Sequence, residues 1–277
     1  MISNYQLISR INNGNHGSIY TAKKNGSTGT TYAIKKIPKL QFNKESKYWI
    51  SNEITNIQKT QSSRFVNHVY EVIDQSDAAY IVQDFCTAGS LYDNFVHHGP
   101  YSERAVTQIT YQILDALVAC YVNDIVFSDL KMKNIMVFSQ QQPEMRLVDF
   151  GSSQICKDGE HLQRDKSTPT YAAPEVFQGH FDKSVDMWGV GIIMYKALTG
   201  RYPFWKCSWE EVEHMPTRKF YRGLVRNDVI FDETMSESVQ DLLSTLLAKD
   251  PSKRMNPIQA VRHPVFAELH KEVFVRR

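Results

Sequence analysis

The sequence predicts an α+β fold in which a small, sheet-rich lobe is followed by a larger, mainly helical lobe. Up to about residue 84, short runs of β-branched and aromatic residues alternate with polar turns, which is typical of strands. Beyond residue 90, apolar residues recur at helical spacing over long segments. The chain has 277 residues, which at about 150 residues per domain is enough for two such units.

The first lobe is predicted from two clear strands and one helix between them. Residues 31–34 (TYAI) and 79–82 (AYIV) are β-rich runs bounded by polar turns. Residues 44–59 carry apolar side chains at helical spacing, so one helix interrupts the strands. We therefore expect this lobe to span about residues 1–83, with a connection over residues 84–89.

The second lobe, about residues 90–277, is predicted to consist mainly of helices. Ser102 is a suitable N-cap for one amphipathic helix, and Ser236 opens another. Residues 184–198 are apolar on nearly every side, which indicates a helix buried in the middle of the lobe.

Composition and charge place the chain among ordinary globular proteins. Apolar residues make up 42% and charged residues 22%, which excludes a disordered chain, a collagen and a disulfide scaffold. The net charge of +2 and the lack of a long apolar stretch argue against nucleic-acid and membrane partners. The start of the chain does not resemble a signal peptide, so we expect a cytoplasmic location, with a nuclear location left open. We also expect the protein to be a monomer. The cysteines lie far apart, without metal-ligand spacing, at Cys86, Cys120, Cys156 and Cys207.

A candidate phosphate loop precedes a lysine that lies in an apolar strand. Gly14 and Gly17 separate two strand-like runs, and glycines let backbone N–H groups approach a phosphate closely. Two glycines alone fit an ordinary hairpin turn better. Lys35 adds weight, because a buried lysine needs an anion or a carboxylate partner. Glu53, on the apolar stripe of the next helix, is the candidate partner, and a solvated glutamate is the alternative.

A second polar cluster leads into the apolar run that starts at Ile135. Residues 127–134 (FSDLKMKN) contain Asp129 and Asn134, and Asp149 opens an Asp-Phe-Gly sequence fifteen residues further on. Carboxylate and amide oxygens at strand ends are suitable ligands for Mg²⁺, which it shares with phosphates and water.

In their order along the chain, these motifs resemble those of the eukaryotic protein kinases, over about residues 5–266. The resemblance continues in residues 173–175 (APE), 186–191 (DMWGVG) and 250–254 (DPSKR). It implies a bilobal protein kinase-like fold, with residues 1–277 forming one kinase domain. Within the family, the equivalents of Glu175 and Arg254 form a buried ion pair. Residues 203–205 (PFW) are weakly similar to the calcium/calmodulin-dependent group.

The resemblance implies the catalytic roles. Lys35 would hold the α- and β-phosphates of ATP and pair with Glu53, while Asn134 and Asp149 would bind Mg²⁺. Asp129 would orient the substrate hydroxyl and accept its proton, and Lys131 would neutralise the γ-phosphate. The remaining residues implied for nucleotide binding are Asn12, Gly14 and Gly17 at the phosphates, Ile19, Ala33 and Met136 around the adenine, the backbone of Asp84 and Cys86 at its edge, and Gln83 behind it.

The sequence departs from the family pattern at three positions in these motifs. Asn12 replaces the first loop glycine, and asparagine tolerates positive φ better than other residues that have a Cβ. Phe127 and Ser128 replace the His and Arg of the catalytic loop. Phenylalanine still suits an apolar stack, but the missing arginine usually clasps an activation-loop phosphate, and Arg164 stands where that phosphate usually lies. We therefore expect activity that does not require activation-loop phosphorylation.

The expected substrates are serine and threonine hydroxyls of proteins, because Lys131 and residues 168–171 (TPTY) resemble serine/threonine kinases. Lys133 stands where relatives that prefer basic substrates commonly carry glutamate. It either favours acidic or phosphorylated substrate residues or is a solvated loop lysine. The basic residues 218–222 (RKFYR) either dock a partner or are solvated. The alternative to an active kinase is a pseudokinase scaffold, but Lys35, Asp129 and Asp149 are all present.

Overall fold

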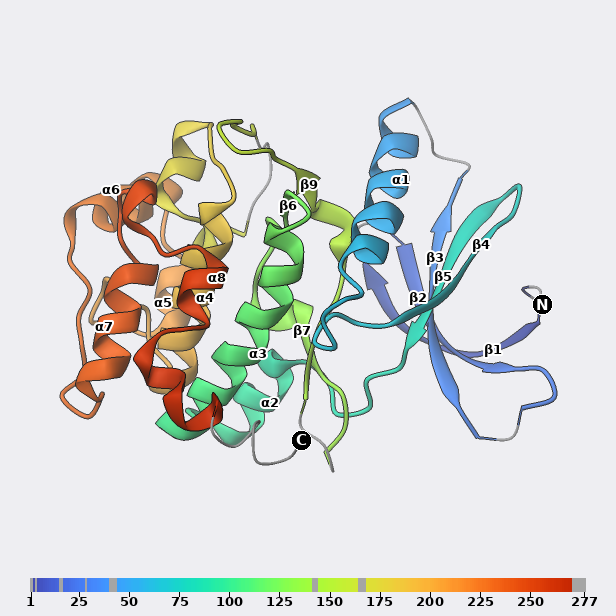
Figure 1. Ribbon diagram of the computed structural model, residues 1–277, viewed down its shortest axis with the longest axis horizontal. Helices are drawn as coiled ribbons and strands as arrows, with labels where there is room; N and C mark the ends of the chain where they lie inside the picture. Colours follow the sequence, from blue (N-terminus) through green and yellow to red (C-terminus); the bar gives the residue numbers. More distant parts are fainter. Residues whose placement is uncertain are drawn as a thin grey trace.

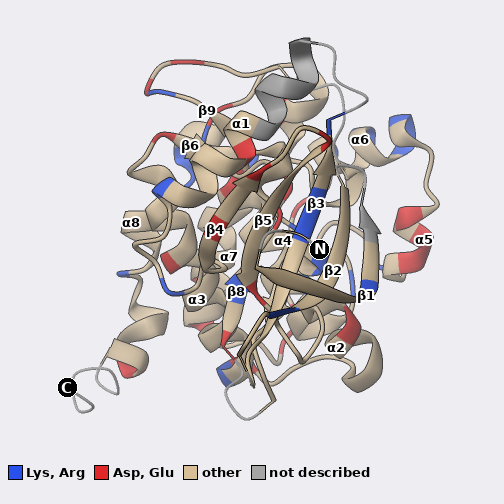
Figure 2. Ribbon diagram, turned by 90° about the vertical axis from the view of Figure 1, so that its right-hand side faces the viewer, with Lys and Arg blue, Asp and Glu red and all other residues tan. Residues whose placement is uncertain are grey.

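The computed structural model describes residue 2 and residues 4–14, 17–27, 29–39, 44–140, 144–163 and 168–270. The chain forms two unequal lobes, a sheet at one end of the molecule and a group of helices at the other (Figure 1). Acidic and basic positions are interspersed over both lobes (Figure 2). No helix among the described residues is long and apolar enough to span a bilayer.

The first lobe contains a five-stranded antiparallel sheet with the strand order β1-β2-β3-β5-β4. Alternation along β3 places Ile34 on the outer face, where it joins a small core with Tyr5 and Tyr80. Lys35 therefore points to the opposite face, towards the second lobe. The five strands are β1 (Tyr5–Gly14), β2 (Gly17–Lys24), β3 (Thr31–Pro38), β4 (Val69–Asp74) and β5 (Ala78–Asp84).

One helix, α1 (Lys44–Lys59), covers the inner face of the sheet, as the apolar spacing predicts. It packs against β4 and against η2 (Phe150–Ser152), which belongs to the second lobe. Ile57 from α1 joins the large core of the helical lobe, so α1 connects the two lobes.

The second lobe is built around α4 (Ser184–Thr199), which is buried on nearly every side, as predicted. Ser102 and Ser236 cap the helices α3 and α7 through their hydroxyl groups, also as predicted. The tail was expected to form the last helix, and its residues 271–277 lie outside the described part of the chain. The other helices are α2 (Leu91–His98), α3 (Glu103–Tyr121), α5 (Trp209–Glu213), α6 (Thr217–Arg226), α7 (Glu237–Leu246) and α8 (Pro257–Ala260).

Two short antiparallel ribbons between the lobes carry the loops with the polar motifs. The pairs are β6 (Ile125–Val126) with β9 (Gln154–Ile155) and β7 (Ile135–Val137) with β8 (Met145–Leu147). The predicted turn between β7 and β8 falls on residues 141–143, which lie outside the described residues. The 3₁₀ turns of the lobe are η1 (Met132–Asn134), η2, η3 (Pro169–Tyr171), η4 (Pro174–Gln178), η5 (Pro251–Lys253) and η6 (Pro264–Phe266).

Candidate active site

Lys35 lies between two carboxylates that come from different lobes. Its Nζ is ion-paired with Glu53 of α1 and lies 2.7 Å from Oδ1 of Asp149, directly before η2. Only 6% of Lys35 and 4% of Glu53 is exposed, so the alternative of a solvated Glu53 does not apply. Burial alone would lower the pKa of Lys35, but Glu53 and Asp149 outweigh it and raise that pKa. The amine is therefore a permanent cation at the junction of the lobes.

The backbone at Asp149 is left-handed, with φ 66° and ψ 73°. This conformation is rare for residues other than glycine, and it directs Phe150 into the core while Asp149 meets Lys35. Phe150 packs edge-on against Phe127, with ring centroids 5.1 Å apart, and both rings are fully buried. Phe127 thus fills the apolar stack, as its substitution for histidine predicts.

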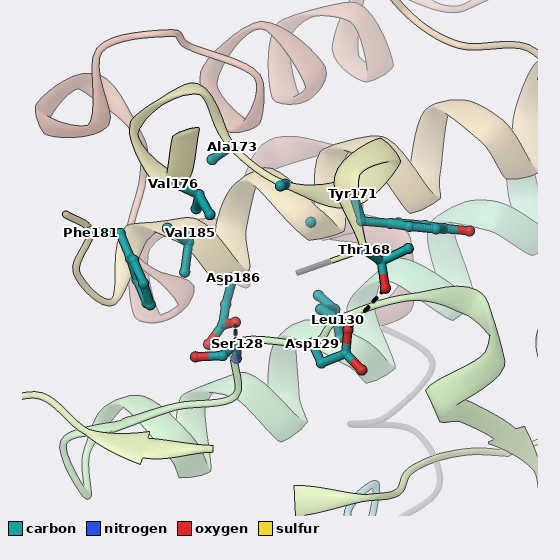
Figure 3. Close-up of a pocket in the computed structure, with 12 residues that line it drawn as sticks. Ser128, Asp129, Leu130, Thr168, Tyr171, Ala173, Val176, Phe181, Val185 and Asp186 are labelled. Carbon is teal, nitrogen blue, oxygen red and sulfur yellow. Dashed lines mark hydrogen bonds between the residues drawn. The ribbon is translucent and has the colours of Figure 1, made fainter. Parts of the chain in front are cut away.

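Asp129 is surrounded by donors from its own loop and from the segment before η3. Lys131 Nζ lies 2.7 Å from Oδ2, and Asn134 Nδ2 donates to Oδ2 and to the main-chain oxygen at 3.2 and 2.9 Å. Thr168 Oγ1 donates to Oδ1 at 3.2 Å (Figure 3). The predicted grouping of Asp129, Lys131 and Asn134 is therefore present, and Thr168 joins it from forty residues further along the chain.

Asp186, near the start of the buried helix α4, anchors this loop, and Figure 3 shows its carboxylate next to Ser128. Its carboxylate accepts from the backbone N–H groups of Phe127 and Ser128 at 2.7 and 2.8 Å. Ser128 has a positive φ of 70°, so two charge-assisted hydrogen bonds fix a strained turn beside Asp129. The motif that contains Asp186 was recognised in the sequence, but its contact with the catalytic loop was not predicted. The available signal was a carboxylate at the start of an otherwise apolar helix.

A pocket lies between the catalytic loop and η3. Asp129 and Thr168 line one part of it, and Tyr171 stands beside them (Figure 3).

Asn134 and Asp149 are suitable ligands for Mg²⁺. The backbone N–H of Val148 donates to the Asn134 carbonyl at 3.0 Å, which holds the ends of β7 and β8 together. Asn134 donates through Nδ2, which leaves its Oδ1 as an acceptor, and the Asp149 side chain is 44% exposed. The described residues contain no cluster of three or more His, Cys, Asp or Glu that could hold a metal ion. An amide and a carboxylate oxygen suit Mg²⁺, which uses few protein ligands and completes its shell with phosphates and water.

The residues predicted around the adenine converge at the connection between the lobes. Ala33 lies opposite Gln83 across β3 and β5, and Gln83 is buried. Met136 of β7 forms a bridge with Ser90 from the other side, below the sheet.

At the hinge, the Asp84 carbonyl already accepts from Asn67 Nδ2 at 3.2 Å, and its N–H donates to His68. The Cys86 N–H has no partner among the described residues, which suits an adenine edge. Burial raises the pKa of the Cys86 thiol to about 12, so that thiol is unreactive.

The phosphate loop is formed by the ends of β1 and β2. Gly17 has a φ of 147°, and a Cβ there would lie 2.4 Å from the Lys36 carbonyl oxygen, so only glycine fits. Gly14 pairs with Gly17, and Asn12 pairs with Ile19. Asn12 does not have the positive φ that the sequence argument allowed for it, because it continues the strand before the turn. Asparagine therefore needs no special tolerance at this position.

A buried ion pair holds the lower part of the helical lobe together. Arg254 donates to both carboxylate oxygens of Glu175, and 0% of its side chain is exposed. This is the pair that the resemblance implied for residues 175 and 254.

The two-lobed fold, the lysine with two carboxylates and the anchored catalytic loop together define a protein kinase. The family model described as the protein kinase domain matches residues 5–266, and the chain belongs to that family. A relative named probable myosin light chain kinase from Dictyostelium discoideum is 33% identical over 94% of this chain and 81% of its own length. Calcium-dependent protein kinase 21 from Arabidopsis thaliana is 29% identical over 94% of this chain.

Calcium-dependent protein kinase 12 from rice, Oryza sativa subsp. japonica, is similar at 29% identity over 94% of this chain. The chain spans about half of each calcium-dependent relative, 48% for both the Arabidopsis and the rice protein. The weak similarity to the calcium/calmodulin-dependent group, predicted from residues 203–205, is confirmed.

Proposed function

We propose that the chain is an active, ATP- and Mg²⁺-dependent serine/threonine protein kinase. The observation that carries this proposal is Lys35, which contacts Glu53 and Asp149 at the same time. Lys35 therefore joins strand β3, helix α1 and the segment that begins at Asp149. Its ammonium group is charged and would bind phosphate oxygens. Phosphoryl transfer depends mainly on such positioning and on charge compensation.

The geometry gives each group around Asp129 a task. Thr168 shows that a hydroxyl of threonine size reaches Asp129 Oδ1, the atom proposed to accept the substrate proton. Lys131, which contacts Oδ2, would neutralise the negative charge that gathers on the transferring phosphoryl group. Asn134 and Asp149 would hold Mg²⁺, which neutralises phosphate charge when bound.

We further propose that this activity does not require a phosphorylated activation loop. Ser128 offers no cation to clasp a phosphate, and its backbone is instead fixed by Asp186. Arg164, at the usual phosphate position, lies outside the described residues. A carboxylate from α4 thus supports the catalytic loop without any modification. Phosphatase treatment should leave activity within about 2-fold, and abolished activity would contradict this part of the proposal.

Transfer of radiolabelled phosphate from ATP to a generic protein tests the catalytic proposal. We expect transfer by the wild type, and a loss of about 10²- to 10⁴-fold in Asp129→Asn, because the general base is removed while the shape is kept. Asp149→Asn should also lose most of its activity, and the remaining activity should no longer depend on Mg²⁺. Signal that persists in both variants would indicate a contaminant. No transfer by the wild type, together with ATP-dependent thermal stabilisation, would favour the pseudokinase scaffold.

All four cysteines are free thiols, which supports a reducing compartment. We propose a cytoplasmic, monomeric enzyme whose partners are protein substrates rather than nucleic acid or membrane. The near-balanced charge supports this choice of partners.

A further inference from the structure

Lys196 is a buried lysine in the middle of the helical lobe that does not contact a carboxylate. It lies on α4 with 2% of its surface exposed. Its Nζ lies 3.6 Å from the ring centroid of Trp209, and 5.2 and 5.8 Å from those of Tyr92 and Phe95. Within the described residues, aromatic faces are therefore its only close partners.

A second lysine approaches the same aromatic group from the solvent side. Lys133, in η1, is exposed, and its Nζ lies 4.8 Å from the Tyr92 ring centroid. Tyr92 is thus in contact with Lys133 and with Lys196. Among the described residues, neither ammonium group has an ion pair with a carboxylate.

Two of the carboxylates around this pair have hydrogen-bond partners of their own. Glu213 of α5 accepts a hydrogen bond from Trp209 Nε1 at 2.7 Å. Asp93 of α2 accepts from the N–H and the hydroxyl of Ser90 in a capping box. Neither carboxylate is ion-paired with Lys133 or Lys196, and the two ammonium groups face the same Tyr92 ring.

The lysine pair lies next to the candidate acceptor site. Lys133 follows Asp129 by four residues in the catalytic loop. Tyr171 lines the pocket together with Asp129, and its ring centroid lies 5.2 Å from that of Trp209, which covers Lys196. The contacts from Lys196 to the pocket that contains the proposed general base therefore run through two aromatic rings, those of Trp209 and Tyr171.

A buried cation without a counter-charge is unfavourable, and contact with aromatic faces offsets only part of the cost. In keeping with this cost, burial lowers the pKa of Lys196 to about 8. Glu213 and Glu210 oppose that shift, and Lys133 adds to it. An anion that bound beside both lysines would compensate both charges.

We propose that Lys133 and Lys196 form a recognition site for an acidic or phosphorylated side chain close to the acceptor hydroxyl of the substrate. This inference rests on the proposed protein kinase function and specifies its substrate class. Lys133 is the exposed arm of the site and Lys196 its buried base. Of the two interpretations of Lys133 that the sequence left open, the structure favours substrate recognition, because Lys196 supplies a second cation next to it.

Matched peptides test the proposal. Each carries one serine acceptor and, at scanned flanking positions, aspartate, phosphoserine, alanine or arginine. At the best position, we expect kcat/KM for the aspartate or phosphoserine peptide to exceed that for the arginine peptide by about 10-fold, which corresponds to about 1.4 kcal/mol. The aspartate and phosphoserine arms distinguish carboxylate from phosphate as the preferred anion.

Three variants locate the effect. Lys133→Glu should reverse the preference towards arginine, and Lys196→Met should reduce the acidic preference to near parity. Lys219→Glu makes the same charge change as Lys133→Glu at an exposed lysine of α6 and should leave the preference unchanged. Because Lys133 is exposed, its variant decides the matter even where Lys196→Met does not fold, which thermal unfolding would reveal.

The outcomes separate this inference from the proposed function. Transfer to all peptides without acidic preference, or with a preference that Lys133→Glu leaves unchanged, would overturn the recognition site alone. Absence of transfer to every peptide and protein would overturn the proposed function. In that case, binding of fluorescent aspartate and arginine peptides, followed by anisotropy, still decides whether the lysine pair selects an acidic chain.

Discussion

Lys35 in the sheet lobe and Lys196 in the helical lobe are both buried, with 6% and 2% of their surface exposed, but their surroundings are opposite. Lys35 contacts two carboxylates, and its pKa is raised despite burial. Lys196 contacts aromatic rings, and burial lowers its pKa to about 8. The same side chain thus remains a firm cation in one lobe and becomes a titratable group in the other.

The difference shows two ways in which a fold prepares an anion site. Around Lys35, the protein supplies its own counter-charges and thereby connects the lobes before any nucleotide is bound. Around Lys196, the counter-charge is missing, and the proposal is that the substrate supplies it. A buried lysine with carboxylates indicates structure and catalysis together, whereas one without them indicates recognition of an external anion.

The largest effect is expected when the lysine with two carboxylates is removed. Lys35→Met leaves Glu53 buried and opposite no cation, so we expect the free energy of unfolding to fall by about 3–5 kcal/mol. The rate of phosphate transfer should fall by about 10²- to 10³-fold, because a charge that stabilises the phosphates is lost. Denaturant unfolding measures the change in the free energy of unfolding, and kcat with a generic substrate measures the change in the transfer rate.

Lys36→Met is the matched control for this prediction. Lys36 is the next residue of β3, and its Nζ lies 3.5 Å from Asp77 in a partly exposed ion pair. Its replacement should change the free energy of unfolding by less than about 1 kcal/mol. Equal losses in the two variants would mean that the contacts of Lys35 with its carboxylates have no special weight.

The next largest effect concerns pH. The groups that face Lys196 are Tyr92 on α2, Lys133 on η1, Glu210 and Glu213 on α5, and Trp209 with Tyr171 at the edge. As pH rises through about 8, Lys196 loses its charge, while an aspartate in the substrate stays ionised. The kcat/KM ratio of aspartate to alanine peptides should therefore fall several-fold between pH 7 and 9.5.

In Lys196→Met this step in the ratio should be absent, because no group with a pKa of about 8 remains beside the site. A step that persisted in the variant would assign it to another group and remove Lys196 from recognition. Taking a ratio of two peptides cancels the pH dependence of the chemical step, which both share.

The contrast between the two lysines also marks what the sequence could predict. Lys35 was predicted as buried and paired because apolar residues flank it in a strand that follows the glycine pair, and Glu53 lay on the inward stripe of a periodic helix. The Asp129, Asn134 and Asp149 loops were found through their order along the chain. These features depend on local patterns, which a single sequence contains.

Lys196 and Asp186 could not be assigned roles in the same way, because both lie in α4, which is apolar on nearly every side. Such a helix has no polar face, so its periodicity does not reveal where a polar side chain points. Their partners come from distant loops and depend on how α2, α5 and the catalytic loop pack around α4. The contact of Thr168 with Asp129 is non-local for the same reason.

A smaller effect of opposite sign to that at Lys35 is expected from removing the unpaired charge. Lys196→Met replaces a buried cation by an apolar side chain of similar length, and we expect the free energy of unfolding to rise by about 1–2 kcal/mol at pH 7. The folded-state pKa of Lys196 lies below its ordinary value, so the unfolded chain binds more protons between about pH 8 and 10.5. The contribution of Lys196 to the free energy of unfolding of the wild type therefore rises with pH between about pH 8 and 10.5.

Denaturant unfolding at pH 7 and pH 10 measures this prediction. The advantage of the methionine variant should shrink at pH 10, where the wild-type lysine is neutral when folded. A variant less stable than the wild type at both values would show that contact with the aromatic faces outweighs desolvation.

The smallest effect is expected from a carboxylate beside Lys196 that does not pair with it. Glu213 has the largest upward effect on the pKa of Lys196, while its Oε1 accepts from Trp209 Nε1. Glu213→Gln keeps an oxygen for that indole and removes the charge, so the pKa of Lys196 should fall further. The pH at which the aspartate preference is half lost should then move down by a fraction of a unit. An upward shift would mean that Glu213 competes with the substrate for Lys196, and the site would have its counter-charge after all.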